Sequence, residues 1–285
     1  MAIDRRQLKY GFLFALVGIN VLIFTLVLLR PSHILTVSFL DVGQGDAILI
    51  ESPTGTDVLI DGGRDRSVVR ELPKRLGPFD RTIDLVVATH PDADHIGALP
   101  SVLDRYQVSY VLEPGVSSDT SPTKAFAASV LEEKGVTTML ARRGMRINLG
   151  GGAHMDVLFP DRNVSGLETN TGSVIARLVY GETSFLLTGD APSSIENWLT
   201  LLDGEELKSN ILKAGHHGSR TSTSEAWLSA VDPSVVVISA GKDNSYGHPH
   251  AEVLENIQAS GASMEATLGE GTVTFVSDGK SVRRK

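Results

Sequence analysis

The sequence predicts an α/β protein in which a sandwich of sheets is covered by helices and preceded by a single N-terminal transmembrane helix. Three observations lead to this expectation. An uncharged apolar stretch covers residues 10–29. After Pro31, segments rich in β-branched residues alternate with helix-like segments. Hairpin-like strand pairs also stand beside strand–helix units, a mixture typical of sheets covered by helices. We therefore divide the chain into a membrane anchor, residues 1–30, and one folded domain, residues 31–285.

The apolar stretch has about the 20 residues that an α-helix needs to cross a bilayer. A buried core helix and a cleaved signal peptide are the alternatives, but the apolar part of a signal peptide is usually about 7–15 residues long and ends at a small-residue cleavage site. This stretch instead runs into Leu-Leu-Arg-Pro. Arg5, Arg6 and Lys9 precede it and only Arg30 follows closely, so the positive-inside rule places the N-terminus in the cytoplasm. We expect a single-pass protein of the cell membrane that contacts lipid through residues 10–29, with its C-terminal domain extracytoplasmic.

The first half of the domain is expected to open with an antiparallel meander and to continue with strand–helix units. Gly or Pro turns separate three segments that are rich in apolar and β-branched residues. A helix is expected over 67–76, although Pro73 disfavours its interior. The strands and helices predicted for this half cover 34–40, 47–51 and 57–61 (strands), then 83–89 (strand), 96–106 (helix), 109–113 (strand) and 123–134 (helix).

The second half repeats this organisation. Gly181-Glu182 separates two strand-like segments, which is a hairpin signal, and a helix is expected to begin near Pro192. The remaining predicted elements are strands over 174–180 and 183–188, a strand over 210–214, a helix over 224–231, a strand over 235–239, a helix over 250–259 and a final hairpin within 263–277.

The composition excludes several classes of function. The formal net charge of −8 argues against a protein that coats nucleic acid through bulk positive charge. The chain contains no cysteine, which excludes disulfides, thiolate metal sites and cysteine nucleophiles. Any metal ion must therefore be held by histidines and carboxylates.

The strongest functional signal is Thr-His-Pro-Asp-Ala-Asp-His over residues 89–95. A buried strand is expected to end here, so His90, Asp92, Asp94 and His95 follow its carboxyl end, where α/β sheets usually place their ligands. Two imidazoles and two carboxylates in so short a loop perturb one another unless a cation lies between them. The alternative is a solvated polar turn. The pattern favours a metal site.

The motif His-x-Asp-x-Asp-His resembles the His-x-His-x-Asp-His motif of the metallo-β-lactamase superfamily, in the form found in the extracytoplasmic hydrolase domain of ComEC competence proteins. The resemblance covers about residues 34–279 and implies the αββα sandwich of that superfamily. Further segments that resemble this domain are residues 39–47, 59–63, 186–191, 212–219 and 244–249.

The resemblance implies a site with two divalent metal ions, Zn²⁺ or Mn²⁺. It implies that His90 and Asp92 bind one ion, that Asp94 and His95 bind the second, and that Asp190 bridges them, because a carboxylate can span ions about 3.5–4 Å apart. The remaining implied ligand is His216.

The same resemblance implies the catalytic residues, which are His217, His248 and Asp94. Either His217 or His248 is expected to touch the substrate or to protonate the leaving group, since imidazole exchanges a proton near neutral pH. Asp61 is expected to orient the ligand loop through hydrogen bonds; a helix or turn cap beside Gly62 is nearly as good an interpretation.

Two departures from the family pattern matter. The usual second histidine of the motif is Asp92, and the region that often carries a further histidine reads Asn170-Thr171-Gly172-Ser173. Oxygen-rich ligation shifts the preference from zinc toward harder ions such as manganese. The second departure is architectural, because a ComEC protein has a multi-helix channel and this chain has one predicted span. A separate membrane channel protein is then an expected partner.

Two other patterns are set aside. Gly43-Gln44-Gly45 follows a strand but lacks the third glycine of a dinucleotide fingerprint, since position 48 is isoleucine. A basic cluster is interpreted as a solvated strand edge, with phosphate binding as the alternative; its members are Arg142, Arg143 and Arg146.

The expected function is metal-dependent hydrolysis of a phosphoester by metal-bound hydroxide. The leading substrate class, on the resemblance alone, is DNA cleaved outside the membrane during DNA uptake. One alternative is a hydrolase of a cell-envelope phosphoester or a small molecule. Another is a non-catalytic receptor for DNA uptake, which the complete set of ligand types disfavours.

Overall fold

The computed structural model describes residues 5–28, 33–77, 79–242 and 244–285. The chain divides into two compact units, one up to Ser32 and one from His33 onward. The predicted boundary between residues 30 and 31 lies outside the described residues. Each unit is described by itself.

The first unit contains the helix α1 (Arg5–Leu28), which has 24 residues. Two of its polar side chains bond within the helix: the Asn20 amide donates to the Leu16 carbonyl at 2.8 Å, and the Thr25 hydroxyl donates to the Val21 carbonyl at 2.8 Å. Among the helices that the structure describes, none combines the length and apolar character of a membrane span. The prediction that residues 10–29 cross a bilayer is therefore not confirmed.

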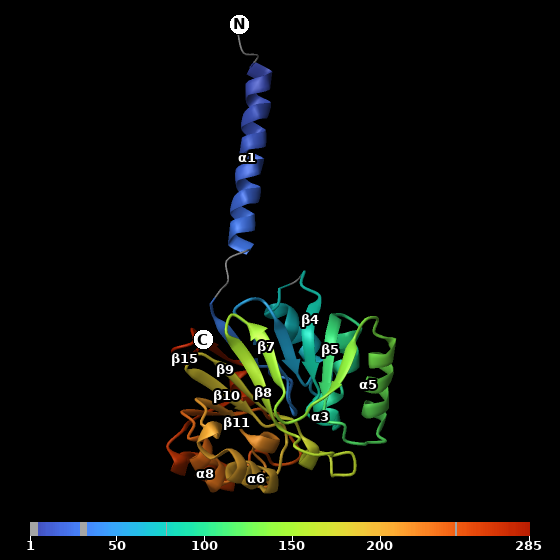
Figure 1. Ribbon diagram of the computed structural model, residues 1–285, viewed down its shortest axis with the longest axis vertical. Helices are drawn as coiled ribbons and strands as arrows, with labels where there is room; N and C mark the ends of the chain where they lie inside the picture. The colour runs from blue at the N-terminus through green and yellow to red at the C-terminus, as the bar shows by residue number, and fades with distance from the viewer. Residues whose placement is uncertain (1–4, 29–32, 78, 243) are drawn as a thin grey trace. The chain divides into compact units, whose positions relative to one another are not determined.

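The second unit contains two sheets that face each other (Figure 1). The first has eight strands in the order β15-β14-β1-β2-β3-β4-β5-β6. Its strands are β1 (Leu35–Phe39), β2 (Ile48–Glu51), β3 (Asp57–Ile60), β4 (Thr82–Val87), β5 (Gln107–Glu113), β6 (Thr137–Leu140), β14 (Val273–Ser277) and β15 (Val282–Arg284).

The second sheet has seven strands in the order β13-β12-β11-β10-β9-β8-β7. Its strands are β7 (Arg146–Gly150), β8 (Ala153–Phe159), β9 (Ile175–Tyr180), β10 (Thr183–Leu187), β11 (Ile211–Lys213), β12 (Val235–Ile238) and β13 (Ser263–Ala266).

Each sheet combines an antiparallel part with a parallel part. In the first sheet β3, β4, β5 and β6 run parallel, and in the second β10, β11, β12 and β13 do so. Loops at the carboxyl ends of parallel strands meet at one edge, which is where such sheets place functional residues.

Helices cover the outer face of each sheet. Those packed on the first sheet are α2 (Ser67–Glu71), α4 (Leu99–Leu103) and α5 (Ser121–Glu132). Those packed on the second are α6 (Ser193–Asp203), α7 (Glu225–Val231) and α8 (Ala251–Ser260). Shorter elements are α3 (Ala93–Ile96), α9 (Thr267–Glu270) and the 3-10 turns Leu72–Lys74, Asn170–Gly172, Gly204–Leu207 and Gly215–Gly218.

Besides the two apolar clusters under the outer helices, a further cluster fills the space between the sheets and joins them into one domain. Its aromatic centre consists of Phe39, Phe185 and Phe275, whose rings meet edge to face with centroids 6.2 and 6.3 Å apart. Edge-to-face aromatic pairs contribute about 0.5–1.5 kcal/mol beyond the burial of their area. The layers are therefore helix, sheet, sheet and helix, as predicted.

Several expected elements differ from the observed ones. The predicted final hairpin is wrong: β13 pairs with β12, whereas β14 pairs with β1 and β15 in the other sheet. Val273 and Phe275 belong to the core between the sheets, so burial draws this strand across the sandwich. The predicted helix over 96–106 is divided near Gly97. A Cβ there would lie 2.5 Å from the Arg64 carbonyl oxygen, so the chain passes too closely for another residue.

The basic cluster matches its interpretation as a strand edge only at Arg146, because Arg142 and Arg143 lie in the segment between β6 and β7. Arg146 lies on β7, the edge strand of the second sheet, and its guanidinium bonds Asp156 at 2.6 Å. Arg143 is ion-paired with Asp203, and Arg142 donates to the Pro114 carbonyl at 2.9 Å. All three guanidinium groups have partners within the fold.

Candidate metal centre

The predicted site residues meet at the edge where parallel strands end. The loop with His90 to His95 follows β4, Asp190 follows β10, and His216 and His217 follow β11. His248 precedes α8. The two sheets thus contribute ligands from opposite sides of the sandwich.

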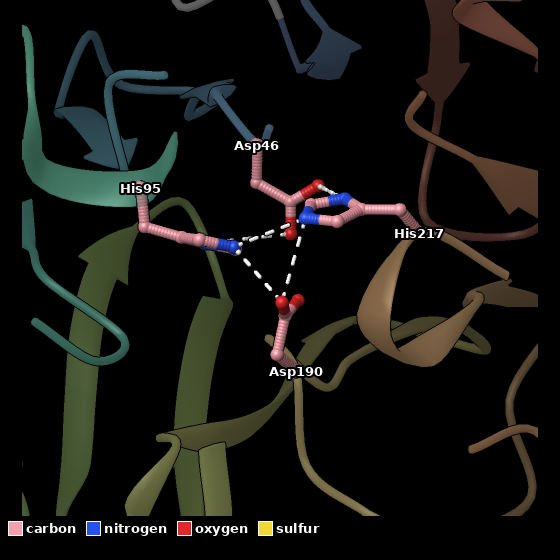
Figure 2. Close-up of side chains that lie close together, drawn as sticks. All are labelled: Asp46, His95, Asp190 and His217. Atoms are coloured by element: carbon pink, nitrogen blue, oxygen red, sulfur yellow. Dashed lines mark hydrogen bonds and ion pairs between the residues drawn. The ribbon is translucent and has the colours of Figure 1, made fainter. Parts of the chain in front are cut away.

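Four imidazoles surround one carboxylate oxygen, Oδ2 of Asp190. Their Nε2 atoms lie from it at 3.2 Å for His95, 3.4 Å for His217, 3.7 Å for His216 and 3.8 Å for His90. His90, His95 and His217 are buried, as is Asp190. Figure 2 shows two of these rings, those of His95 and His217, directed at Asp190.

Hydrogen bonds at the opposite ring nitrogen determine which form His95 and His217 adopt. His95 donates from Nδ1 to Oδ2 of Asp61 at 2.7 Å, and His217 donates from Nδ1 to the Ser239 carbonyl at 3.0 Å. Since these partners only accept, each neutral ring keeps its lone pair on Nε2. The two Nε2 atoms are 3.2 Å apart, so their lone pairs need a proton or a cation between them.

The other two rings follow the same rule. Thr89 donates its hydroxyl to Asp61 at 2.6 Å and accepts from Nδ1 of His90 at 3.0 Å. The Thr221 hydroxyl donates to Ser219 at 3.1 Å, so it accepts from Nδ1 of His216 at 3.0 Å. Both therefore also direct an Nε2 lone pair at Asp190. Such second hydrogen bonds are typical of metal-ligating histidines.

The electrostatics of the cluster also fit a missing positive charge. Burial alone would lower the pKa of both His95 and His217, yet nearby carboxylates, chiefly Asp190, raise the pKa of His95 well above its usual value and that of His217 to about 9. Burial would raise the pKa of Asp190, but the positive charges of His217 and His95 lower it well below its usual value. Buried Nε2 of His90 has no hydrogen-bond partner. The donor set therefore fits divalent cations.

Two further carboxylates divide the donors into two groups around Asp190. Oδ2 of Asp92 lies 3.8 Å from Nε2 of His90, whereas Oδ2 of Asp94 lies 3.6 Å from Nε2 of His217. The structure thus brings all six predicted metal ligands together. It also places His217, predicted to be catalytic, in the closest group of potential ligands.

His248 stands one step farther from the centre. Its ring centroid is 5.5 Å from that of His216 and 6.4 Å from that of His217. Asn244 fixes its backbone, accepting from the His248 amide at 2.9 Å and donating to its carbonyl at 2.6 Å. Burial and the nearby charges of His216 and His217 lower the pKa of His248 to about 4.

Unusual backbone conformations hold the ligand loops. His216 and His217 both have positive φ, 49° and 56°, and Asp61 has φ 58°. Positive φ is costly for residues with a Cβ and clusters at functional sites. The Asp61 carboxylate also accepts from the Thr89 amide at 2.8 Å, so the prediction that Asp61 orients the ligand loop is confirmed.

Two buried residues of the site were not predicted from the sequence: Asp46, between β1 and β2, and Lys213, the last residue of β11. Oδ2 of Asp46 and Nζ of Lys213 are 2.5 Å apart. Asp46, His95, Asp190 and His217 form a group whose ligand atoms lie within 4.8 Å of one another. A lysine at the end of an apolar strand, three residues before a histidine pair, was the available signal for Lys213.

A two-sheet sandwich with helices on both outer faces, and a histidine–carboxylate centre at one edge, defines a class of metal-binding hydrolase folds. Comparison with known proteins agrees with this class. Residues 40–242 match the metallo-β-lactamase superfamily. A novel metallo hydrolase, Igni18 of Ignicoccus hospitalis, has the same fold, with a TM-score of 0.53 and 17% identity over 85% of this chain and 98% of its own.

The chain belongs to the metallo-β-lactamase superfamily. It is 30% identical to ComE operon protein 3 of Bacillus subtilis over 96% of this chain and 37% of that protein. It is 33% identical to recombination protein 2 of Haemophilus influenzae over 90% of this chain and 31% of that protein. The chain thus spans about a third of the length of these relatives, and the predicted family resemblance is confirmed.

Proposed function

We propose that the protein is a dinuclear metal-dependent phosphodiesterase. The observation that carries the proposal is the convergence of four imidazole Nε2 atoms on one oxygen of Asp190. His90, Asp92 and His216 would hold one ion, Asp94, His95 and His217 would hold the other, and Asp190 would contribute to both. When bound, two such ions supply a hydroxide nucleophile and stabilise negative charge on the phosphate.

His217 is accordingly proposed as a metal ligand, while His248 keeps the role of substrate contact. Because its pKa is lowered to about 4, His248 is neutral at pH 7 and carries one N–H to donate to a phosphate oxygen. Its Nδ1 is buried without a hydrogen-bond partner. Asn244 supports this role by holding the His248 backbone from both sides.

The surroundings of His248 suit a nucleic-acid substrate. The ring of Tyr246 is about half exposed and stacks on His248 with centroids 5.6 Å apart. Arg64 donates to the Tyr246 hydroxyl at 3.3 Å, and Arg220 is exposed beside His250. Exposed aromatic rings flanked by arginines bind single-stranded nucleic acid by stacking and charge.

DNA is the proposed substrate, cleaved during its uptake, and the name of the relative recombination protein 2 agrees with DNA as the class of ligand. Hydrolysis of a cell-envelope phosphoester or of a small molecule is the second candidate, because an overall charge of −8 does not favour a long polyanion. A non-catalytic DNA receptor is the third. The exposed, arginine-flanked ring of Tyr246 favours DNA over the second candidate, and the complete set of metal-ligand types disfavours the third.

Purified full-length protein loaded with Mn²⁺ or Zn²⁺ should cleave single-stranded DNA and a small phosphodiester such as bis(p-nitrophenyl) phosphate. Asp94→Ala and His95→Ala should abolish both reactions with the fold intact by circular dichroism. His154→Ala, a histidine of β8 that faces Asp156, is the matched control. Cleavage of the small compound alone supports the second candidate. Retained DNA binding without any hydrolysis supports the receptor.

We also propose that the N-terminal segment anchors the catalytic domain outside the cell membrane, beside a separate channel protein. The support is the uncharged stretch of residues 10–29 with basic residues before it. Protease added to intact spheroplasts should digest the domain. Protection of the domain would reverse the proposed orientation.

A further inference from the structure

Lys213 places a fully buried ammonium group beside the candidate metal centre. It projects from the end of β11, donates to the Gly189 carbonyl at 2.9 Å and lies 2.5 Å from Oδ2 of Asp46. It also faces Oδ1 of Asp190 at 3.6 Å. A buried charge is strongly destabilising unless a counter-charge and hydrogen bonds compensate it. A lysine here therefore needs a carboxylate that the metal ions do not claim.

Asp46 and Asp190 face opposite edges of the imidazole rings of His95 and His217. Asp46 faces the Nδ1 edges, with Oδ1 at 3.5 Å from His217 and Oδ2 at 3.9 Å from His95. Asp190 faces their Nε2 edges at 3.4 and 3.2 Å. In Figure 2 the two carboxylates lie on different sides of the His95–His217 pair. An ion that accepts both Nε2 lone pairs would lie on the side of Asp190.

We infer that Asp46 is the counter-ion of Lys213 rather than a metal ligand, and that this ion pair positions Asp190 so that its Oδ2 is left for the metal centre. The inference rests on the proposed function, in that it takes divalent ions to bind at this cluster. Asp46 extends from the first sheet and Lys213 from the second, so the pair also joins the two sheets beneath the site.

The charge balance of the buried site agrees with this role. Two divalent ions and one ammonium neutralise five carboxylates when the imidazoles are uncharged. Without Asp46, the ammonium of Lys213 would be left with Asp190 as its only charged neighbour among the ion pairs that the structure describes, and it would compete with the ions for that carboxylate. The five carboxylates in this balance are Asp46, Asp61, Asp92, Asp94 and Asp190.

The decisive experiment is a rescue of metal binding. Dissociation constants for Zn²⁺ and Mn²⁺ alone are measured on the full chain by competition with a chelating dye. Asp46→Asn should weaken binding about 10- to 100-fold, the usual cost of losing a group that supports a metal ligand. Asp46→Asn combined with Lys213→Met should restore binding to within about threefold of the unchanged protein, because a neutral pair replaces an ion pair.

Lys208→Met is the matched control, since this lysine is exposed and pairs only with Glu205 among its described ion pairs; it should leave metal affinity unchanged. A double variant as weak as Asp46→Asn would identify Asp46 as a ligand and overturn the inference, as would an Asp46→Asn protein with normal affinity. If Asp46→Asn does not fold, the double variant alone decides in the same way. If the unchanged protein binds neither ion, the proposed function falls too; if it binds and the double variant does not, only this inference falls.

Discussion

The two sheets build their halves of the site in different ways. The first sheet supplies four ligand candidates from one six-residue stretch, His90 to His95. Asp61 holds that stretch through one hydrogen bond to His95 and two to the preceding Thr89. The second sheet supplies Asp190, His216 and His217 from two separate loops. Its histidines depend on positive φ and on single bonds to Thr221 and Ser239. One half is a compact motif with a shared support, whereas the other is assembled from separately held parts.

This difference implies that a single support variant should damage the first half more than the second. It also implies that Asp190, which belongs to the second half but touches ligands of both, has no substitute. The following predictions test these statements, starting with the largest expected effect.

Asp190→Ala should remove the carboxylate that both ligand groups share. We expect loss of metal binding and a fall in kcat/KM of more than about 100-fold. This exceeds the roughly 10- to 100-fold loss that follows when a group that only supports a metal ligand is removed. Metal content by elemental analysis and hydrolysis of a small phosphodiester measure the two effects. Full metal occupancy in this variant would contradict the shared role of Asp190.

Asp61→Asn should lower metal affinity about 10- to 100-fold, because it weakens the supports of both His95 and the Thr89–His90 pair. Thr221→Val removes only the Nδ1 partner of His216 and should cost less than about tenfold. The measurement is the Zn²⁺ dissociation constant of each variant at constant pH. Equal losses would show that the two halves are supported equally.

Tyr246→Ala tests the place where the rims of the two halves meet, since Arg64 from the first half donates to Tyr246 from the second. Loss of one aromatic ring that stacks on a base costs about 1–3 kcal/mol, so KM for single-stranded DNA should rise about 5- to 150-fold. Tyr246→Phe keeps the ring but not the hydroxyl, so it should raise this KM much less. Similar KM values for both variants would exclude stacking.

The metal-free protein should become less stable as the pH rises from about 6.5 toward 9. The folded pKa of His217 is raised to about 9 and that of His95 is raised well above its usual value. A raised pKa stabilises the fold below the unfolded value, and this contribution is lost as pH rises through the folded value. We expect a fall in Tm of roughly 5 °C. With metal bound, calorimetry should show little of this dependence.

The same contrast explains what the sequence could predict. The first half of the site was predictable because its ligands are neighbours in the chain. Asp190 and His216 came only through family resemblance, because their partners are distant in sequence. Asp46 and Lys213 were missed, since an acidic residue in a glycine turn and a lysine at a strand end do not reveal that the two side chains meet.

The fold shows a similar limit. The strand–helix units were predictable from their apolar periodicity, but no bounds were predicted for β6, β7 and β8, and β6 and β7 are largely exposed edge strands. The sheet to which a strand belongs is a tertiary property, and this is why β13 and β14 were wrongly paired. Gly45 gives a further example: a Cβ there would lie 2.0 Å from the Asp94 carbonyl oxygen. Glycine at this position lets the backbone pass close to the ligand loop and is not part of a dinucleotide-binding motif.

The convergence on Oδ2 of Asp190 has a consequence for folding. Each proposed ligand group draws side chains from both sheets, so neither sheet alone can hold an ion. Metal affinity and the closure of the sandwich are then thermodynamically linked, and each tenfold gain in free metal above the dissociation constant adds about 1.4 kcal/mol to the closed state. The apolar layer between the sheets and the ions at its edge would both stabilise the closed sandwich. A destabilising substitution at Phe39, Phe185 or Phe275 should therefore also lower the apparent affinity for metal.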